Sequence, residues 1–192
     1  MSFGQFFIKP STALLALVIF AGSTVLLGRF NPKNPIIERL GDRYFSTDQT
    51  WCWRPQDLFD MLDMYSPDGK EIRAHIRFIY LDLVYPLIYS VTVAILLAAL
   101  LPALLPATQT WLRYLAFLPV VIAVFDYLEN LSLLWILQRY SATYRPFGLA
   151  RFSSAMTTVK LFLMWATAAL LIACLVALVV KLFRNSPAAT RP

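Results

Sequence analysis

The chain has 192 residues, of which 59% are hydrophobic and 15% aromatic, and its formal net charge is +6. Soluble domains are about 45–50% apolar, so this composition indicates an integral membrane protein and argues against a soluble domain. The basic residues are scattered near the ends of apolar stretches, which argues against nucleic acid as a partner.

Four apolar stretches have the length of membrane-spanning helices. The first lacks an A-x-A cleavage site and is expected to be an uncleaved helix. The sequence therefore predicts an all-α fold, a single membrane domain built as an integral membrane four-helix bundle. The predicted spans lie at about 11–27, 76–101, 111–137 and 156–183.

A polar first loop, 28–74, carries eight of the eleven acidic residues. Within it, Pro55 is expected to begin a short amphipathic helix whose aspartates lie on the face opposite its apolar residues. The apolar face consists of Leu58, Phe59, Leu62 and Tyr65. This helix is expected to lie on the membrane surface or to cover a cleft in the bundle. Trp51 and Trp53 are interpreted as an interfacial anchor.

The third apolar stretch contains Asp126, Glu129 and Asn130, which are spaced to share one helix face. Two acids at mid-helix cost about 5–7 kcal/mol, roughly what the surrounding apolar residues return (about 4.5–9 kcal/mol). Acids within a membrane span are candidate functional residues. The alternative is a polar clasp that only holds helices together.

The second stretch places His75, Asp82, Tyr85 and Tyr89 on one face, and Pro86 is expected to kink it. The position of these residues along the predicted helix places Asp82 in the half of the membrane nearer the first and third loops.

Lys160 in the fourth stretch and Glu129 in the third fall in that same half. At about 1.5 Å per residue, Asp82, Glu129 and Lys160 lie about 8, 15 and 13 Å from the nearest flanking arginine. The sequence thus predicts one shared polar pocket, with Asp126 deeper in it, where three acids face one lysine.

If the pocket is catalytic, Asp126 and Glu129 are the expected acid–base pair, with Asp82 or Lys160 as the charge partner. The side chains expected to bind and orient a ligand are Tyr85, Tyr89, Asn130 and His75. With one histidine and no close cysteine pair, no metal site is expected, and no cofactor motif is present.

The segment GKEIRAHIRFIYLDLVYPLIYS, followed by FDYLENLSLL, resembles a recurring pattern in uncharacterised small four-span membrane proteins of bacteria. The pairing of LDxxYPxxY with DxxEN carries this resemblance, which covers roughly residues 55–140 and implies an architecture without an activity. The architecture is also similar to the four-span sterol-isomerase-like membrane domain, as an analogy of fold only.

The leading hypothesis is a multi-pass protein of the bacterial inner membrane whose buried acidic pocket binds a hydrophobic, lipid-like small molecule, with acid–base chemistry on it if it is an enzyme. The alternatives are a structural or accessory membrane subunit and a proton or cation pathway. A pathway would call for a homodimer, because four spans are few for a transporter. The distribution of basic residues favours first and third loops in the cytoplasm and both termini outside.

Overall fold

The computed structural model describes residues 10–29, 31, 33–105 and 107–185, and their regular structure is helical apart from one isolated bridge between Ser141 and Tyr144. In chain order the elements are α1 (Pro10–Arg29), α2 (Asn34–Leu40), the 3-10 turn η1 (Gly41–Arg43), α3 (Pro55–Asp63), α4 (Lys70–Asp82), α5 (Tyr85–Leu104), the 3-10 segment η2 (Ala107–Phe117), α6 (Leu118–Arg139) and α7 (Phe147–Asn185). The all-α prediction is confirmed.

Three helical stretches are long and apolar enough to cross a membrane: Lys70–Leu104, Trp111–Arg139 and Phe147–Lys181. These agree with the second, third and fourth predicted spans and support a membrane protein. The apolar part of α1, Leu14–Arg29, is shorter.

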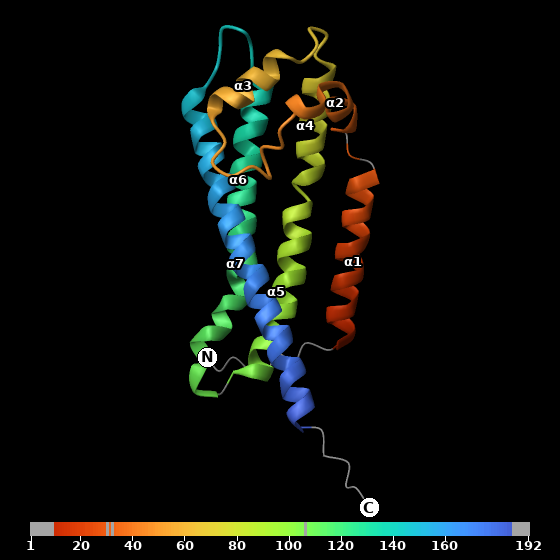
Figure 1. Ribbon diagram of the computed structural model, residues 1–192, viewed down its shortest axis with the longest axis vertical. Helices are drawn as coiled ribbons and strands as arrows, with labels where there is room; N and C mark the ends of the chain where they lie inside the picture. Colours follow the sequence, from red (N-terminus) through yellow and green to blue (C-terminus); the bar gives the residue numbers. More distant parts are fainter. Residues whose placement is uncertain (1–9, 30, 32, 106, 186–192) are drawn as a thin grey trace, which may run out of the picture.

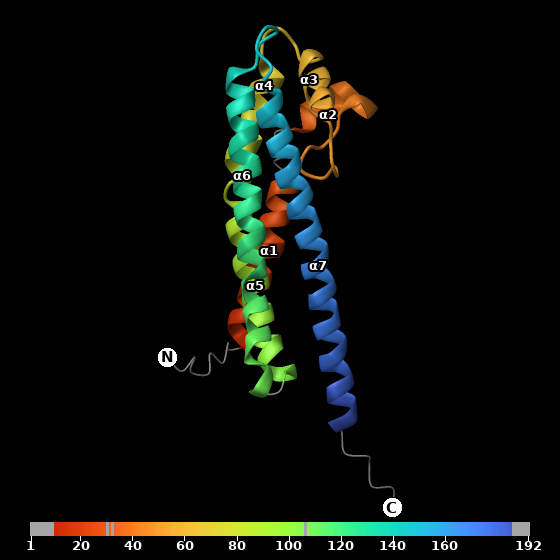
Figure 2. The same ribbon diagram turned by 90° about the vertical axis from the view of Figure 1, so that its left-hand side faces the viewer.

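The long helices run side by side along the length of the molecule, and α1 packs against α5 (Figures 1 and 2). The Thr92 hydroxyl of α5 donates a hydrogen bond to the Ala16 carbonyl of α1 over 3.3 Å. The α6–α7 turn lies at the same end as α2 and α3, whereas η2 and the far end of α7 lie at the opposite end (Figure 1).

A break divides the second predicted span into α4 and α5 at Leu83 and Val84. Pro86 lies in the first turn of α5, where its missing N–H leaves no helical hydrogen bond unmade. The kink expected from Pro86 is therefore present, and it lies directly after Asp82.

The third apolar stretch begins at Trp111, as predicted, but its first turns are not α-helical, and the fourth begins earlier than expected. Residues from Trp111 onward form part of η2, so α6 begins only at Leu118, with Pro119 in its first turn. Helix α7 begins at Phe147, nine residues before the expected 156, directly after Pro146. The early turns of α7 are anchored by packing, since Ala150 is fully buried and the Phe147 ring meets that of Phe59 at 4.8 Å.

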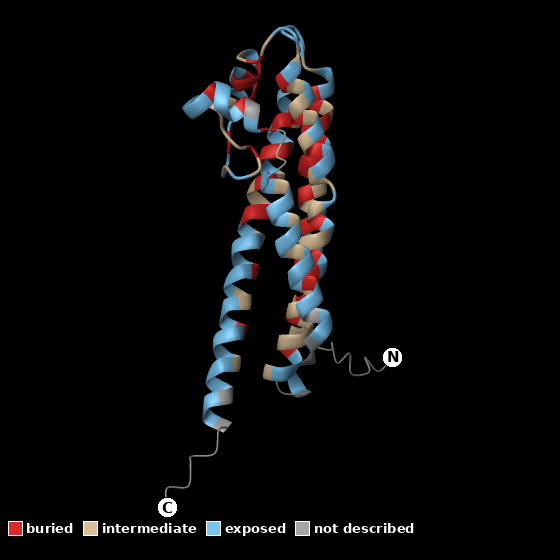
Figure 3. Ribbon diagram, turned by 90° about the vertical axis from the view of Figure 1, so that its right-hand side faces the viewer, coloured by how far each residue is buried: buried red, intermediate tan, exposed pale blue. Residues whose placement is uncertain are grey.

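The segment between α1 and α4 folds onto one end of the bundle. Its helix α3 buries Leu58, Phe59 and Leu62, and Tyr65 just after the helix is buried too, as predicted from their spacing, while Asp60 stays exposed. These side chains join a core cluster with residues of α4, α6 and α7, including Ile79, Leu133, Ile136 and Ala150. The far half of α7, in contrast, is largely exposed (Figure 3).

Candidate functional site

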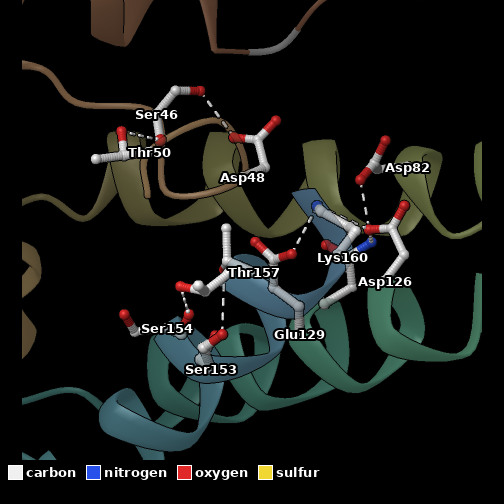
Figure 4. Close-up of polar contacts among 12 residues, drawn as sticks. Ser46, Asp48, Thr50, Asp82, Asp126, Glu129, Ser153, Ser154, Thr157 and Lys160 are labelled. Carbon is white, nitrogen blue, oxygen red and sulfur yellow. Dashed lines mark hydrogen bonds and ion pairs between the residues drawn. The ribbon is translucent and has the colours of Figure 1, made fainter. Parts of the chain in front are cut away.

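Lys160 of α7 is the centre of a buried polar cluster. Its ammonium Nζ lies 2.6 Å from Oε2 of Glu129 and 3.2 Å from Oδ1 of Asp126, both on α6 (Figure 4). Glu129 is fully buried and Lys160 is 4% exposed. One turn of α6 therefore presents two carboxyl groups to one lysine, as the i, i+3 spacing predicts.

Asn130 and Tyr89 extend this cluster to the second predicted span. The Asn130 amide donates to Oδ2 of Asp82 over 3.0 Å and to Oδ1 of Asp126 over 3.5 Å. The Tyr89 hydroxyl donates to Oδ2 of Asp126 over 3.0 Å. Asp126 thus contacts α5, α6 and α7 together.

A cavity of about 350 Å³ adjoins the cluster, between α1, α5, α6, α7 and the loop before α3. Its polar lining comprises Asp48, Gln49, Asp82, Tyr85, Tyr89, Asp126, Lys160 and Thr167. Its apolar lining comprises Phe20, Val93, Pro119, Ile122, Leu161, Met164, Ala168 and Leu171. Met164, one of the lining residues on α7, is 42% exposed.

Not every residue predicted for the site lines this cavity. Asp82, Asp126, Lys160, Tyr85 and Tyr89 do line it. Glu129 and Asn130 lie behind these residues, so they can act on a ligand only through Lys160, Asp82 or Asp126.

The structure does not bring His75 into the cluster. His75 is buried two turns of α4 away from Asp82, and its Nδ1 lies 3.1 Å from the hydroxyl of Tyr65. It shares a helix face with Asp82, as its spacing predicts, but about 10.5 Å of helix separates the two residues. Its place is in the core beneath α3.

Asp48 also belongs to the site, because the first loop carries it to the cavity. Asp48 Oδ1 lies 3.2 Å from Lys33 Nζ and accepts a 2.7 Å hydrogen bond from Ser46. Burial alone would raise the pKa of the Asp48 carboxyl, but Lys33 and Ser46 outweigh it and lower the pKa from 3.8 to about 2. Only the tertiary path of the loop places this residue, so no local sequence signal marked it.

Trp53 attaches the same loop to α7. Its indole Nε1–H donates to Thr157 over 3.3 Å, and its carbonyl accepts from Ser154 over 2.7 Å. The Cys52 N–H donates to Thr158 over 3.2 Å from a left-handed backbone, φ +47°. The interpretation of Trp51 and Trp53 as one interfacial anchor is wrong for Trp53, which is 4% exposed and packs inside the fold.

The part of the chain that the structure describes contains no group of three or more His, Cys, Asp or Glu side chains placed to hold a metal ion. Comparisons with protein-family models, curated proteins and solved structures found no match for this chain. Any functional conclusion therefore rests on the chemistry of the cluster and its cavity.

Proposed function

We propose that this is a four-helix protein of the bacterial inner membrane that binds a lipid-like small molecule in the cavity. The observation that carries the proposal is the composition of the lining, which combines carboxyl, ammonium and phenol groups with eight apolar side chains from α1, α5, α6 and α7. A volume of about 350 Å³ falls within the range of small-molecule sites.

The proposal takes α1 as the fourth span. Its 20 residues correspond to a helix of about 30 Å, the thickness of the hydrocarbon core. Its outward side chains Leu14, Leu15, Val18, Val25 and Leu26 are about 60% exposed, which suits a lipid-facing surface.

Mass spectrometry of co-purified lipids tests the binding function. Ala168 lines the cavity, whereas Ala169 is exposed on the same helix and lies outside the lining. We expect the unmodified protein and Ala169→Trp to retain a common lipid after purification in mild detergent, and Ala168→Trp to lose it. Equal retention by the two tryptophan variants would count against the cavity as the binding site.

Proton transfer to the bound molecule is the second candidate function. It is favoured by Asp82 and Asp126, which line the same cavity and share the amide of Asn130. Two carboxyl groups in different surroundings can divide the roles of acid and base. Tyr89, which donates to Asp126, would orient that carboxyl group.

Isosteric amides separate proton chemistry from binding alone. Asp126→Asn keeps the shape of the side chain but removes its titratable proton, and Glu129→Gln does the same behind the cavity. If Asp126 transfers a proton, its amide variant keeps its co-purified lipid and loses any conversion of it. If the cluster only holds helices together, both variants keep thermal stability and lipid content.

A further inference from the structure

The charges around the cavity do not balance. Lys160 is shared by Asp126 and Glu129, and Lys33 is paired with Asp48. Asp82 forms an ion pair with neither Lys160 nor Lys33. Asn130 donates to its Oδ2, and its Oδ1 has no hydrogen-bond partner among the described residues. With Lys160 already bound by two carboxyl groups, an anionic headgroup would meet net negative charge.

Three aromatic rings stand beside Asp82 in the cavity lining. Phe20 stacks on Tyr85 with ring centroids 6.1 Å apart, and Tyr85 meets the edge of Tyr89 at 5.6 Å. Hydrogen bonds fix both phenols, because the Tyr85 hydroxyl lies 3.1 Å from Thr24 Oγ1 and Tyr89 donates to Asp126. Aromatic faces attract ammonium groups, and a nearby carboxylate strengthens that attraction.

A second and independent observation points to a ligand in the part of the cavity farther along α7 from Lys160. Thr167 lines the cavity on α7 and is 5% exposed, yet its hydroxyl has no hydrogen-bond partner among the described residues. It lies seven residues beyond Lys160, about 10.5 Å along the helix. A buried hydroxyl normally finds a partner, so the Thr167 hydroxyl is available to a polar atom of a bound molecule.

We propose that the cavity ligand is an amphiphile with an amine headgroup, whose ammonium lies between Asp82 and the rings of Phe20, Tyr85 and Tyr89 and whose chain passes Thr167. This inference rests on the proposed lipid-binding function and adds the chemical class of the headgroup. A hydroxyl or carbonyl oxygen of the chain would pair with Thr167.

Three probes of equal chain length test the headgroup: hexadecylamine, hexadecanol and palmitate, each measured on the full-length protein in nanodiscs of zwitterionic lipid, with empty nanodiscs as the blank. We expect hexadecylamine to bind about tenfold more tightly than hexadecanol, and palmitate to bind more weakly than either. Amine and alcohol binding equally, or palmitate binding most tightly, would overturn the inference.

Matched variants locate the binding. Asp82→Asn should lower the affinity for hexadecylamine about tenfold and leave that for hexadecanol unchanged, which also shows that the variant is folded. Asp60→Asn, the same change on the exposed face of α3, should alter neither affinity. An amine preference that survives Asp82→Asn would refute the assigned position.

The outcomes distinguish the two proposals. If hexadecanol binds and Ala168→Trp blocks it, the lipid cavity stands even when the amine preference is absent. If Ala168→Trp affects none of the three probes, the cavity itself is not the binding site.

Discussion

Lys160 compensates two buried carboxyl groups, and this makes it the residue on which the site depends electrostatically. Its Nζ contacts Asp126 and Glu129, and all three side chains are less than a tenth exposed. A buried charge without its partner is costly, whereas neutral groups of the same shape are tolerated. Removing Lys160 alone should therefore change stability differently from neutralising all three side chains together.

Lys160→Met should lower the free energy of unfolding by about 3–5 kcal/mol, because two carboxyl groups lose their cation. The triple variant that adds Asp126→Asn and Glu129→Gln should recover most of that loss. Thermal unfolding in detergent measures both. A triple variant as unstable as Lys160→Met would show that packing of the lysine stem, rather than its charge, holds the helices.

At the scale of elements, α3 and the loop before it form a cap that packs against the side of the bundle near one end (Figure 2). α3 contributes a buried apolar face, and the loop contributes an ion pair and contacts to α7 through Trp53. The two parts are held by different forces, so they should respond to different perturbations.

Phe59→Ala should destabilise the protein by about 3–5 kcal/mol, because Phe59 is fully buried against α6 and α7. Gln56→Ala on the exposed side of α3 is the control and should cost less than about 0.5 kcal/mol. Hydrogen exchange of the α3 amides should be slow in the unmodified protein and fast in Phe59→Ala. Fast exchange in both proteins would mean that α3 does not dock.

The Lys33–Asp48 pair should make the cap sensitive to acid. The pKa of Asp48 is lowered from 3.8 to about 2 in the folded protein, so its stabilisation is present above pH 3.8 and is lost as pH falls toward 2. This difference between the pKa of Asp48 in the unfolded and folded protein corresponds to about 2 kcal/mol of folding stability. Asp48→Asn should therefore be less stable than the unmodified protein at pH 6 and nearly equal to it at pH 2; an equal difference at both pH values would contradict the assignment.

At the scale of the whole molecule, the first loop and the α6–α7 turn lie at one end and η2 at the other. If α1 and the three long helical stretches all cross the membrane, the excess of basic residues places the capped end in the cytoplasm. Cys52 is exposed at that end, whereas Cys174 is buried.

A membrane-impermeant maleimide should label Cys52 in inverted membrane vesicles and leave it unlabelled in intact cells. Cys52→Ser should abolish the signal in both, which controls for Cys174. Labelling of intact cells would place the cap outside and reverse the proposed orientation.

The sequence was informative wherever local spacing decides structure. Helical periodicity on α6 brought Asp126 and Glu129 to one face, and counting from flanking arginines placed Lys160 at their level. Sequence spacing could not place Asp48, because the path of a loop depends on contacts with residues far along the chain. Nor could hydropathy separate η2 from α6, since an apolar 3-10 segment and an apolar α-helix have the same composition.

The exposure of Met164 and Ala168, which line the cavity on α7, has a kinetic consequence. If α7 spans the membrane and the proposed lipid-like ligand enters past these two residues, it reaches the cavity from the bilayer after dissolving in it. Occupancy then follows the mole fraction of ligand among the surrounding lipids instead of its concentration in water. Two ligands with identical contacts in the cavity would show apparent aqueous affinities that differ by the ratio of their partition coefficients.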